Sequence, residues 1–335
     1  MESKNLKIMM YSKEIIEKLN EIILSYVQGE PVDLYNASAH LLKAGGKRLR
    51  PILLLAVARG YGLEEEKALP AAAAIELLHN FTLVHDDIMD RDTFRRNVPT
   101  VHTIWGDALA ILAGDLLFSK AFEAILDLEK KGIRHDLVVR ATRKLAWASV
   151  TVAEGQALDM DFERRSDVSE EDYMVMIEKK TAALFKAAAE IGAIIAGATR
   201  EQIEHISEYA RLAGKAFQIR DDILGLTADE KKLGKPVYSD IREGKRTILV
   251  IYALKKLDRH RQKELLSILG NRKAPIEKLR YAVKLIEETG AIQYAWRKAN
   301  ELIEKALEHL NKTGISQDVY EMLRELAVFI VSREK

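Results

Sequence analysis

The stretch from residue 68 to residue 90 constrains the fold of this chain more than any other part of the sequence. It is rich in alanine and leucine, and it is apolar almost all the way round a helix. A helix that lies on a protein surface carries a polar stripe, whereas a helix without one is buried on every side. The stretch therefore predicts the central helix of a helical bundle.

The rest of the 335-residue chain also has a helical period. Only six prolines occur, and strand-like alternation between turn residues is scarce. Short connections, with no internal repeat and no linker, favour a single all-α domain over residues 1–335. Helices are expected at about 12–27, 33–43, 51–61, 68–90, 105–127, 134–155, 169–196, 200–224, 239–256, 259–269, 275–288, 291–311 and 317–333.

Composition excludes several classes of protein. The net charge of +1 gives no reason to expect nucleic acid or an anionic membrane as a partner. The absence of cysteine excludes disulfides, thiol catalysis and cysteine-ligated zinc. No uncharged run reaches the roughly 18 residues of a membrane span, and the N-terminus lacks the apolar core of a signal peptide. The expected location is the cytoplasm.

Two acidic clusters end long apolar helices, where the helix dipole disfavours anions. In the first, Asp86 and Asp90 are four residues apart and share a helix face, so they repel each other unless a cation lies between them. The second contains Asp221 and Asp222, with Gln218 on the same face. A single cluster of this kind is often only a solvated helix end. Two of them predict facing halves of a polymetal site, for which oxygen ligands favour Mg²⁺.

Basic residues near both clusters provide counter-charges for a phosphate substrate. Arginine in particular suits bidentate hydrogen bonds to oxyanions. Each of these residues alone is more often a solvated surface charge, and Gly45-Gly46 alone is typical of a helix C-cap. The candidates are Lys47, Arg50, Arg95, Arg96, Lys180, Lys235 and Lys245.

Apolar residues lie one to two turns before the first cluster, among them Leu77, Leu78 and Phe81, together with Thr82. An apolar cavity below metals and cations suits a substrate with a diphosphate head and a hydrocarbon tail. Core packing is the competing explanation for the two leucines. His79 can share a face with the first cluster, so a phosphate contact competes there with a buried core histidine.

Taken in order, these residues resemble the trans-isoprenyl diphosphate synthases over nearly the whole chain. One DDxxD motif is a weak signal, but an ordered set of motifs at family-like spacing is very specific. The set comprises Gly45-Gly46-Lys47-Arg48-Leu49-Arg50-Pro51, Leu78-His79, Asp86-Asp87-Ile88-Met89-Asp90 with Arg95-Arg96, Gly155-Gln156 with Asp159, Lys180-Thr181, and Gln218 with Asp221-Asp222, Lys235, Asp240 and Lys245.

The resemblance implies an isoprenoid-synthase-type bundle with a central apolar cavity, a homodimer, and up to three Mg²⁺ ions, with Mn²⁺ as a substitute. It implies that Asp86, Asp90 and Asp221 bind metal directly, with support from Asp87, Asp159, Asp222 and Asp240. It assigns the allylic diphosphate to Arg95, Lys180 and Lys235, and isopentenyl diphosphate to Lys47, Arg50, His79 and Arg96. Lys245 joins the substrate-binding set. Lys180, Thr181 and Gln218 would stabilise the allylic cation with carbonyl or hydroxyl dipoles.

The implied reaction is the head-to-tail condensation of isopentenyl diphosphate with allylic diphosphates of C5 to C15, by ionisation, condensation and elimination. Phe81 and Thr82 precede the first cluster by five and four residues, where a bulky side chain limits product length in the family. One aromatic residue there favours geranylgeranyl diphosphate (C20), with a farnesyl (C15) or mixed C15/C20 product as the alternative. Two positions depart from the family pattern: Gly225 replaces a third Asp, and Asn97 replaces Gly.

Other functions explain less of the sequence. A metal phosphohydrolase of the HD type would use His85-Asp86, but it leaves Asp87, Asp90 and the second cluster without a role. A catalytically silent partner subunit would be expected to lose acids from one cluster. Terpene cyclisation would not need the second diphosphate pocket that the basic residues predict.

Overall fold

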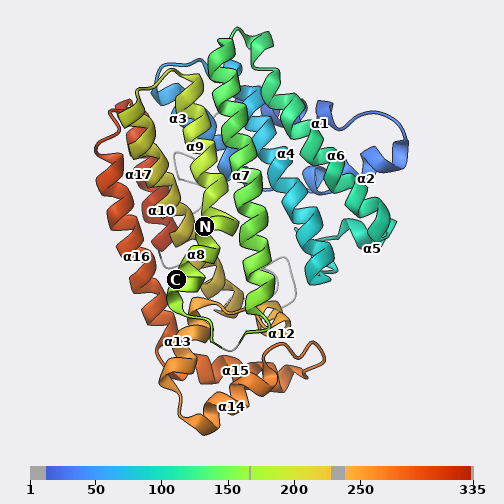
Figure 1. Ribbon diagram of the computed structural model, residues 1–335, viewed down its shortest axis with the longest axis vertical. Coiled ribbons are helices and arrows are strands. Elements are labelled where there is room, and N and C mark those ends of the chain that lie inside the picture. Colours follow the sequence, from blue (N-terminus) through green and yellow to red (C-terminus); the bar gives the residue numbers. More distant parts are fainter. Residues whose placement is uncertain (1–12, 166, 228–237, 333–335) are drawn as a thin grey trace. The chain divides into compact units, whose positions relative to one another are not determined.

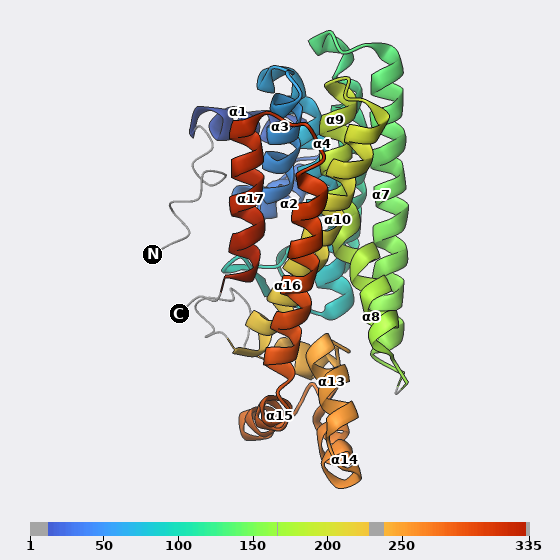
Figure 2. The same ribbon diagram turned by 90° about the vertical axis from the view of Figure 1, so that its left-hand side faces the viewer.

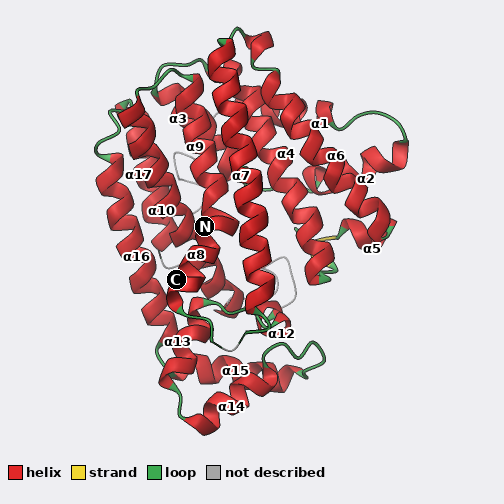
Figure 3. Cartoon of the chain, viewed as in Figure 1, coloured by secondary structure: helices red, strands yellow, loops and turns green. Residues whose placement is uncertain are grey.

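The computed structural model describes residues 13–165, 167–227 and 238–332, and these residues are almost entirely helical (Figures 1 and 3). The all-α prediction is confirmed. In chain order the elements are α1 (Lys13–Tyr26), α2 (Val32–Lys43), α3 (Leu49–Gly60), α4 (Glu65–Asp90), β1 (Phe94–Arg95), β2 (Val98–Pro99), α5 (Val101–Trp105), α6 (Asp107–Leu126), the 3₁₀ turn η2 (Glu129–Lys131), α7 (His135–Phe162), α8 (Glu170–Ile177), the π-helical turn η3 (Glu178–Ala182), α9 (Ala183–Ile195), α10 (Arg200–Thr227), α12 (Ser239–Glu243), α13 (Ile248–Lys256), α14 (Arg259–Ile268), α15 (Ile276–Glu288), α16 (Ala291–Leu310) and α17 (Gln317–Val331).

The chain divides into two compact units. The first consists of Met1–Ser149, Leu184–Ala210 and Leu307–Ala327, and the second of Val150–Ala183, Arg211–Ala306 and Val328–Lys335. Helices α7, α9, α10, α16 and α17 contribute residues to both units. That the two units act as one domain stays a prediction.

Helix α4 forms the core of the first unit. It packs against α1, α3 and α6, and every residue from Ala71 to Leu78 is buried. The expectation of a helix without a polar face is confirmed for this stretch. The helix begins at Glu65, a few residues before the expected start, where two glutamates in its first turn favour the positive end of the dipole.

Glycines mark two helix boundaries that were not expected. Gly106, with a φ of 80°, separates α6 from α5, which lies mostly before the expected helix 105–127, and Gly244, with a φ of 87°, ends α12 within the expected helix 239–256. Both angles lie in a region that side chains other than glycine rarely adopt. The loop after α4 contains the short antiparallel pair β1–β2. Asn97 lies there at a φ of 62°, which asparagine tolerates better than most residues, so its replacement of glycine fits the turn.

The helix expected over 169–196 contains a turn of a different kind. It begins with a capping box, in which Ser169 and Asp172 exchange hydrogen bonds, and continues as α8. Residues Glu178–Ala182 then form the π-helical turn η3 before α9 begins. Figure 2 shows α13, α14 and α15 from another side. Among the described residues, no helix has the length and apolar character that crossing a membrane requires.

Candidate active site

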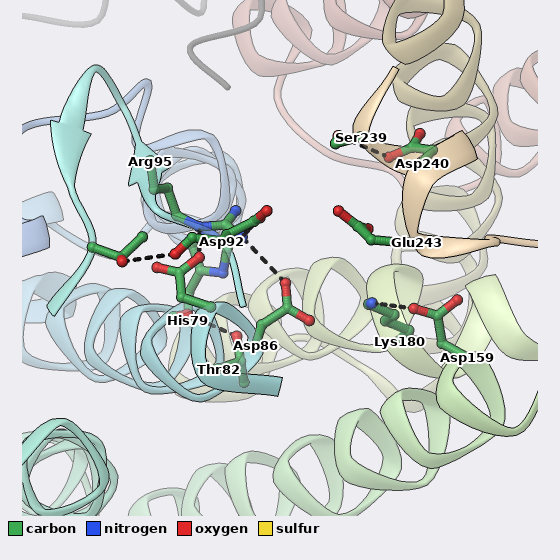
Figure 4. Close-up of polar contacts among 12 residues, drawn as sticks. His79, Thr82, Asp86, Asp92, Arg95, Asp159, Lys180, Ser239, Asp240 and Glu243 are labelled. Atoms are coloured by element: carbon green, nitrogen blue, oxygen red, sulfur yellow. Dashed lines mark hydrogen bonds and ion pairs between the residues drawn. The ribbon is translucent and has the colours of Figure 1, made fainter. Parts of the chain in front are cut away.

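The first acidic cluster surrounds the guanidinium of Arg95. This side chain lies 3.3 Å from Asp86, 3.5 Å from Asp92 and in a close hydrogen bond with Asp87 (Figure 4). The strand pair β1–β2 turns the chain back so that Arg95 reaches the end of α4. Sequence reasoning missed Asp92, although it follows the cluster by only two residues.

The members of this cluster differ in their surroundings. The side chain of Asp87 is 1% exposed, and burial raises its pKa to about 7 although Arg95 opposes the rise. Asp86 and Asp90 are partly exposed one turn apart on α4. Two accessible carboxylates on one face fit a hard cation such as Mg²⁺, which takes one or two protein carboxylates together with substrate oxygens.

The turn between α2 and α3 is held by a buried ion pair. Arg48, at a φ of 48°, places its guanidinium 2.6 Å from Glu76 on α4. The same guanidinium donates hydrogen bonds to the carbonyl of Leu42 at 2.8 Å and to the side chain of Asn20 at 3.1 Å. Lys47, beside it, is exposed. Sequence reasoning gave Arg48 only a place in a motif and gave Glu76 no role.

Arg96 contacts the same turn from the other side. It donates hydrogen bonds to the carbonyls of Leu41, at 2.8 Å, and Gly45. A Cβ at Gly46 would lie 3.0 Å from its guanidinium carbon, so glycine leaves room for this side chain. The described contacts of Arg96 therefore stabilise the loop that carries Lys47. Its expected contact with isopentenyl diphosphate stays a prediction.

Arg50 and His79 lie side by side in the first unit. Arg50 Nη1 is 3.2 Å from His79 Nε2, and its guanidinium lies 4.4 Å from the ring centre of Phe185. Burial, and then the positive charge of Arg50, hold the pKa of His79 well below its usual value. Because arginine can only donate, the neutral imidazole accepts at Nε2 and carries its proton on Nδ1.

A row of aromatic rings extends from α4 to α6. The ring centres of Phe81 and Phe118 are 5.3 Å apart, and those of Phe118 and Phe122 are 5.1 Å apart. Phe81 also contacts the ring of His85, whose Nε2 lies 3.1 Å from the carbonyl of Ile111. The hydroxyl of the expected neighbour, Thr82, donates to the backbone of α4 at 2.7 Å.

The second acidic cluster lies on α10 and forms hydrogen bonds with α8 and η3. Gln218 donates to Asp222 Oδ1 at 2.8 Å, and Tyr173 donates to Asp222 Oδ2 at 2.7 Å. Thr181 donates to the amide oxygen of Gln218 at 2.6 Å. Burial raises the pKa of Asp222 to about 7, and the nearby charge of Asp240 adds to the rise. Asp221, in contrast, is exposed.

Lys180 and Lys245 both contact Asp159. Their Nζ atoms lie 2.6 and 3.0 Å from the same carboxylate oxygen, Oδ2 (Figure 4 draws the first of these contacts). Lys245 also lies 2.9 Å from Glu163. The two ammonium groups hold the pKa of Asp159 below its usual value although burial opposes them. The structure thus brings three expected site residues together, with Asp159 as the partner of the lysines.

The carboxylate of Asp240 lies close to Gly225. A Cβ at residue 225 would be 2.7 Å from Asp240 Oδ2, so the glycine noted as a departure from the family pattern leaves space for this carboxylate. Lys235 lies outside the described residues. Among the residues that the structure describes, no three His, Asp or Glu side chains form a ready-made metal cage.

The comparisons with known proteins agree with these features. A family model described as polyprenyl synthetase matches residues 31–286. The chain is 46% identical to a geranylgeranyl diphosphate synthase of Sulfolobus acidocaldarius, over 97% of this chain and 98% of that one. It resembles the crystal structure of a geranylgeranyl pyrophosphate synthetase from Pyrococcus horikoshii, with a TM-score of 0.89, 44% identity, and coverage of 98% of this chain and 99% of that one. A geranylgeranyl pyrophosphate synthase from Corynebacterium glutamicum, solved with isoprenyl diphosphate and magnesium, is similar with a TM-score of 0.87 and 30% identity, over 96% of this chain and 99% of that one.

Proposed function

The chain belongs to the polyprenyl synthetase family, and from that premise we propose that it condenses isopentenyl diphosphate head-to-tail with allylic diphosphates of C5 to C15. One observation carries this proposal beyond the family. In the first unit, an acidic cluster on α4 and a separate pair, the cationic Arg50 with the neutral His79, come from the same helical core. A prenyl transfer needs both, because the allylic diphosphate is released whereas isopentenyl diphosphate keeps its diphosphate.

Mg²⁺ fits the exposed carboxylates of each cluster. Asp86, Asp90 and Asp221 would bind it directly, and the buried Asp87 and Asp222 would keep the clusters in place through Arg95 and through Gln218 with Tyr173. Bound there, the metal would supply Lewis-acid stabilisation of the diphosphate leaving group. Three further statements are predictions. Both clusters would bind the same diphosphate, Mn²⁺ would substitute for Mg²⁺, and three ions would bind.

The basic residues and the neutral His79 divide between the two substrates. Arg95 and Lys180, together with Lys235, would bind the allylic diphosphate, and Lys245 would support them through Asp159. Lys47, Arg50, His79 and Arg96 would bind isopentenyl diphosphate, which keeps its diphosphate. Relatives solved with isoprenyl diphosphate support this class of substrate.

The oxygen of Thr181 and the amide of Gln218 would face the allylic carbons as the carbon–oxygen bond breaks. Dipoles fixed in this way stabilise developing charge without reorganising. The isopentenyl double bond then attacks the allylic carbon, and a proton leaves for the released diphosphate. No side chain acts as a nucleophile in this scheme.

Product length would be set by the aromatic row below the first cluster. Phe81 lies a turn and a half before Asp86, and Phe118 and Phe122 continue the row on α6. A chain growing along α4 would meet Phe81 first. We therefore propose geranylgeranyl diphosphate as the main product, with a farnesyl or mixed product as the alternative.

A homodimer would cover the apolar outer face of α6. Ile111, Leu112 and Leu126 are 45%, 53% and 50% exposed on this helix. We expect Ile111→Glu with Leu112→Glu to halve the mass measured by light scattering, while Val328→Glu, at an exposed position of α17, leaves it unchanged. A monomeric wild type would contradict the dimer. The cytoplasmic location also stays a prediction.

The function is tested by incubating the protein with isopentenyl diphosphate and each of the C5, C10 and C15 primers, and reading product length by chromatography. We expect a C20 product that requires Mg²⁺. Asp86→Ala should lower the rate more than tenfold, because a direct metal ligand is lost. Absence of product with every primer would exclude the synthase, and hydrolysis of a phosphate ester without isopentenyl diphosphate would favour the phosphohydrolase.

A further inference from the structure

A chain of three hydrogen bonds connects a buried tyrosine to the second half of the site. Tyr173 is fully buried on α8 and donates to Asp222 Oδ2 at 2.7 Å. Asp222 Oδ1 accepts from the amide nitrogen of Gln218 at 2.8 Å, and the amide oxygen of Gln218 accepts from Thr181 at 2.6 Å. All four residues lie in the second unit. Two of them, Thr181 and Gln218, are the residues proposed to face the allylic cation.

This chain has one direction. In its ionised form Asp222 offers acceptors only, so the amide nitrogen of Gln218 faces Asp222 and the amide oxygen faces Thr181. The hydroxyl of Thr181 must then donate to Gln218, which leaves its lone pairs for other partners. If the Gln218 amide turned over, Thr181 would accept from it, and its hydroxyl proton would point elsewhere. The orientation of the Asp222 carboxylate therefore determines whether Thr181 presents its hydroxyl oxygen or its hydroxyl proton to the substrate.

The π-helical turn brings Tyr173 and Thr181 to the same helix face. They are eight residues apart, which in a regular α-helix is about 80° beyond two full turns. In η3 the N–H of Ala183 bonds to the carbonyl of Glu178, five residues back, so this turn holds one residue more than an α-helical turn. The wider turn absorbs the extra angle, and both side chains reach α10.

We propose that Tyr173 is a positioning residue for the allylic-cation site: by holding Asp222, it fixes the amide of Gln218 and thereby the hydroxyl direction of Thr181. Tyr173 itself touches no substrate in this proposal. The role rests on the proposed prenyl transfer. Tyr173 belongs neither to the sequence motifs nor to the basic residues proposed to bind diphosphate. Its sequence neighbours on α8 give no signal, because the contact joins residues 49 positions apart.

The test is Tyr173→Phe, which removes one hydroxyl. We expect kcat to fall about tenfold, the scale of one lost hydrogen bond, while KM for both diphosphates stays within about twofold. The matched control is Tyr209→Phe. Tyr209 is equally buried and donates at 2.7 Å to a backbone carbonyl, that of Leu323, in the first unit. We expect its kcat to stay within about twofold of wild type.

Two further variants separate positioning from general damage. Thr181→Ser keeps the hydroxyl and should keep most of kcat, whereas Thr181→Val should lower it. Adding Tyr173→Phe to Thr181→Val should cost little more, because both changes act on the same dipole. Full additivity, or a kcat for Tyr173→Phe within about twofold of wild type, would overturn the proposal.

A readout without substrate keeps the proposal testable whatever the enzyme makes. In wild type, the side-chain amide protons of Gln218 should exchange slowly by NMR, because Asp222 holds them. In Tyr173→Phe they should exchange at least tenfold faster, at an unchanged exchange rate for Asn80, whose amide is buried against Glu76. Unchanged exchange at Gln218 would refute the positioning role. An inactive wild type with the expected exchange would refute only the proposed function.

Discussion

Arg48 and Glu76 form an ion pair at 2.6 Å in which the two side chains are 6% and 2% exposed. Glu76 also accepts from Asn80 at 3.0 Å and lies 3.9 Å from Arg96. One carboxylate on α4 thus compensates Arg48, in the turn that carries Lys47, and Arg96, which contacts that turn from the loop between β1 and β2. Removing one partner of a buried pair leaves an uncompensated charge.

We therefore expect Glu76→Ala to lower the free energy of unfolding by about 3–5 kcal/mol in urea denaturation. The control is Glu66→Ala. Glu66 also lies 2.6 Å from a cation, Lys18, but its side chain is 63% exposed. That change should leave the free energy of unfolding close to that of wild type, because exposed ion pairs contribute little. Equal losses of unfolding free energy in the two variants would show that burial does not determine how much the ion pair contributes to stability.

The aromatic row predicts how product length responds to mutation. Phe81→Ala removes the first ring below the acidic cluster, so the product should gain at least one C5 unit. Phe118→Ala alone should leave a C20 product, because Phe81 still blocks the path. The double variant should make the longest product of the three. Chain length is read by chromatography of the dephosphorylated alcohols, and an unchanged length in Phe81→Ala would remove Phe81 from this role.

The partly buried imidazole of His79 predicts a pH effect on stability. Its pKa in the folded protein lies well below the ordinary value of 6.5, because of burial and the nearby Arg50. The fold therefore favours the neutral form. The associated stability is fully present above pH 6.5 and is lost as the pH falls from there toward the folded pKa.

NMR should accordingly find no titration of the His79 ring between pH 8 and about 6. The unfolding free energy of wild type should fall relative to that of His79→Gln as the pH is lowered below 6.5. A ring that titrates near 6.5 would show that Arg50 and burial do not act on it as the structure indicates.

Two glycines inside helices, Gly114 in α6 and Gly155 in α7, should respond differently to alanine. At Gly155 a methyl group would meet the backbone of Lys180 in η3, and at Gly114 it would meet the side chain of His85. A side chain can move aside, whereas the backbone of a packed turn cannot. Gly114→Ala should cost about 1–3 kcal/mol of stability, the usual range for overpacking, and Gly155→Ala more. Thermal unfolding measures both, and the reverse order would contradict the contact at Lys180.

Much of this structure follows from patterns along the chain. Every described helix from α1 to α17 lies within or next to an expected range, since a helical period of apolar residues reports which face is buried. The carboxylates of α4 and α10 are also visible in the sequence, because they stand at the ends of apolar helices. Arg50 and His79 were expected near one another, and they are in contact.

Other features depend on tertiary packing and leave no such trace. The partners Arg48 and Glu76 are 28 residues apart, and Tyr173 and Asp222 are 49 apart, so no spacing rule connects them. The contacts of Arg96 with backbone carbonyls could not be told from a ligand-facing role. The breaks at Gly106 and Gly244 were missed because a single glycine also occurs inside helices, so the residue type alone does not reveal a positive φ.

The π-helical turn at Glu178–Ala182 is, in effect, an α-helix with one residue inserted. Deleting a single residue there, such as Lys179, would restore a regular turn without disturbing the register of α8 against α9. In the shortened protein Tyr173 and Thr181 would be seven residues apart, about 20° short of two full turns, so Thr181 would still face α10. The backbone at Lys180, which approaches Gly155 in the wide turn, would be drawn in. The extra residue therefore matters for the backbone packing of this turn and not for the direction of its threonine.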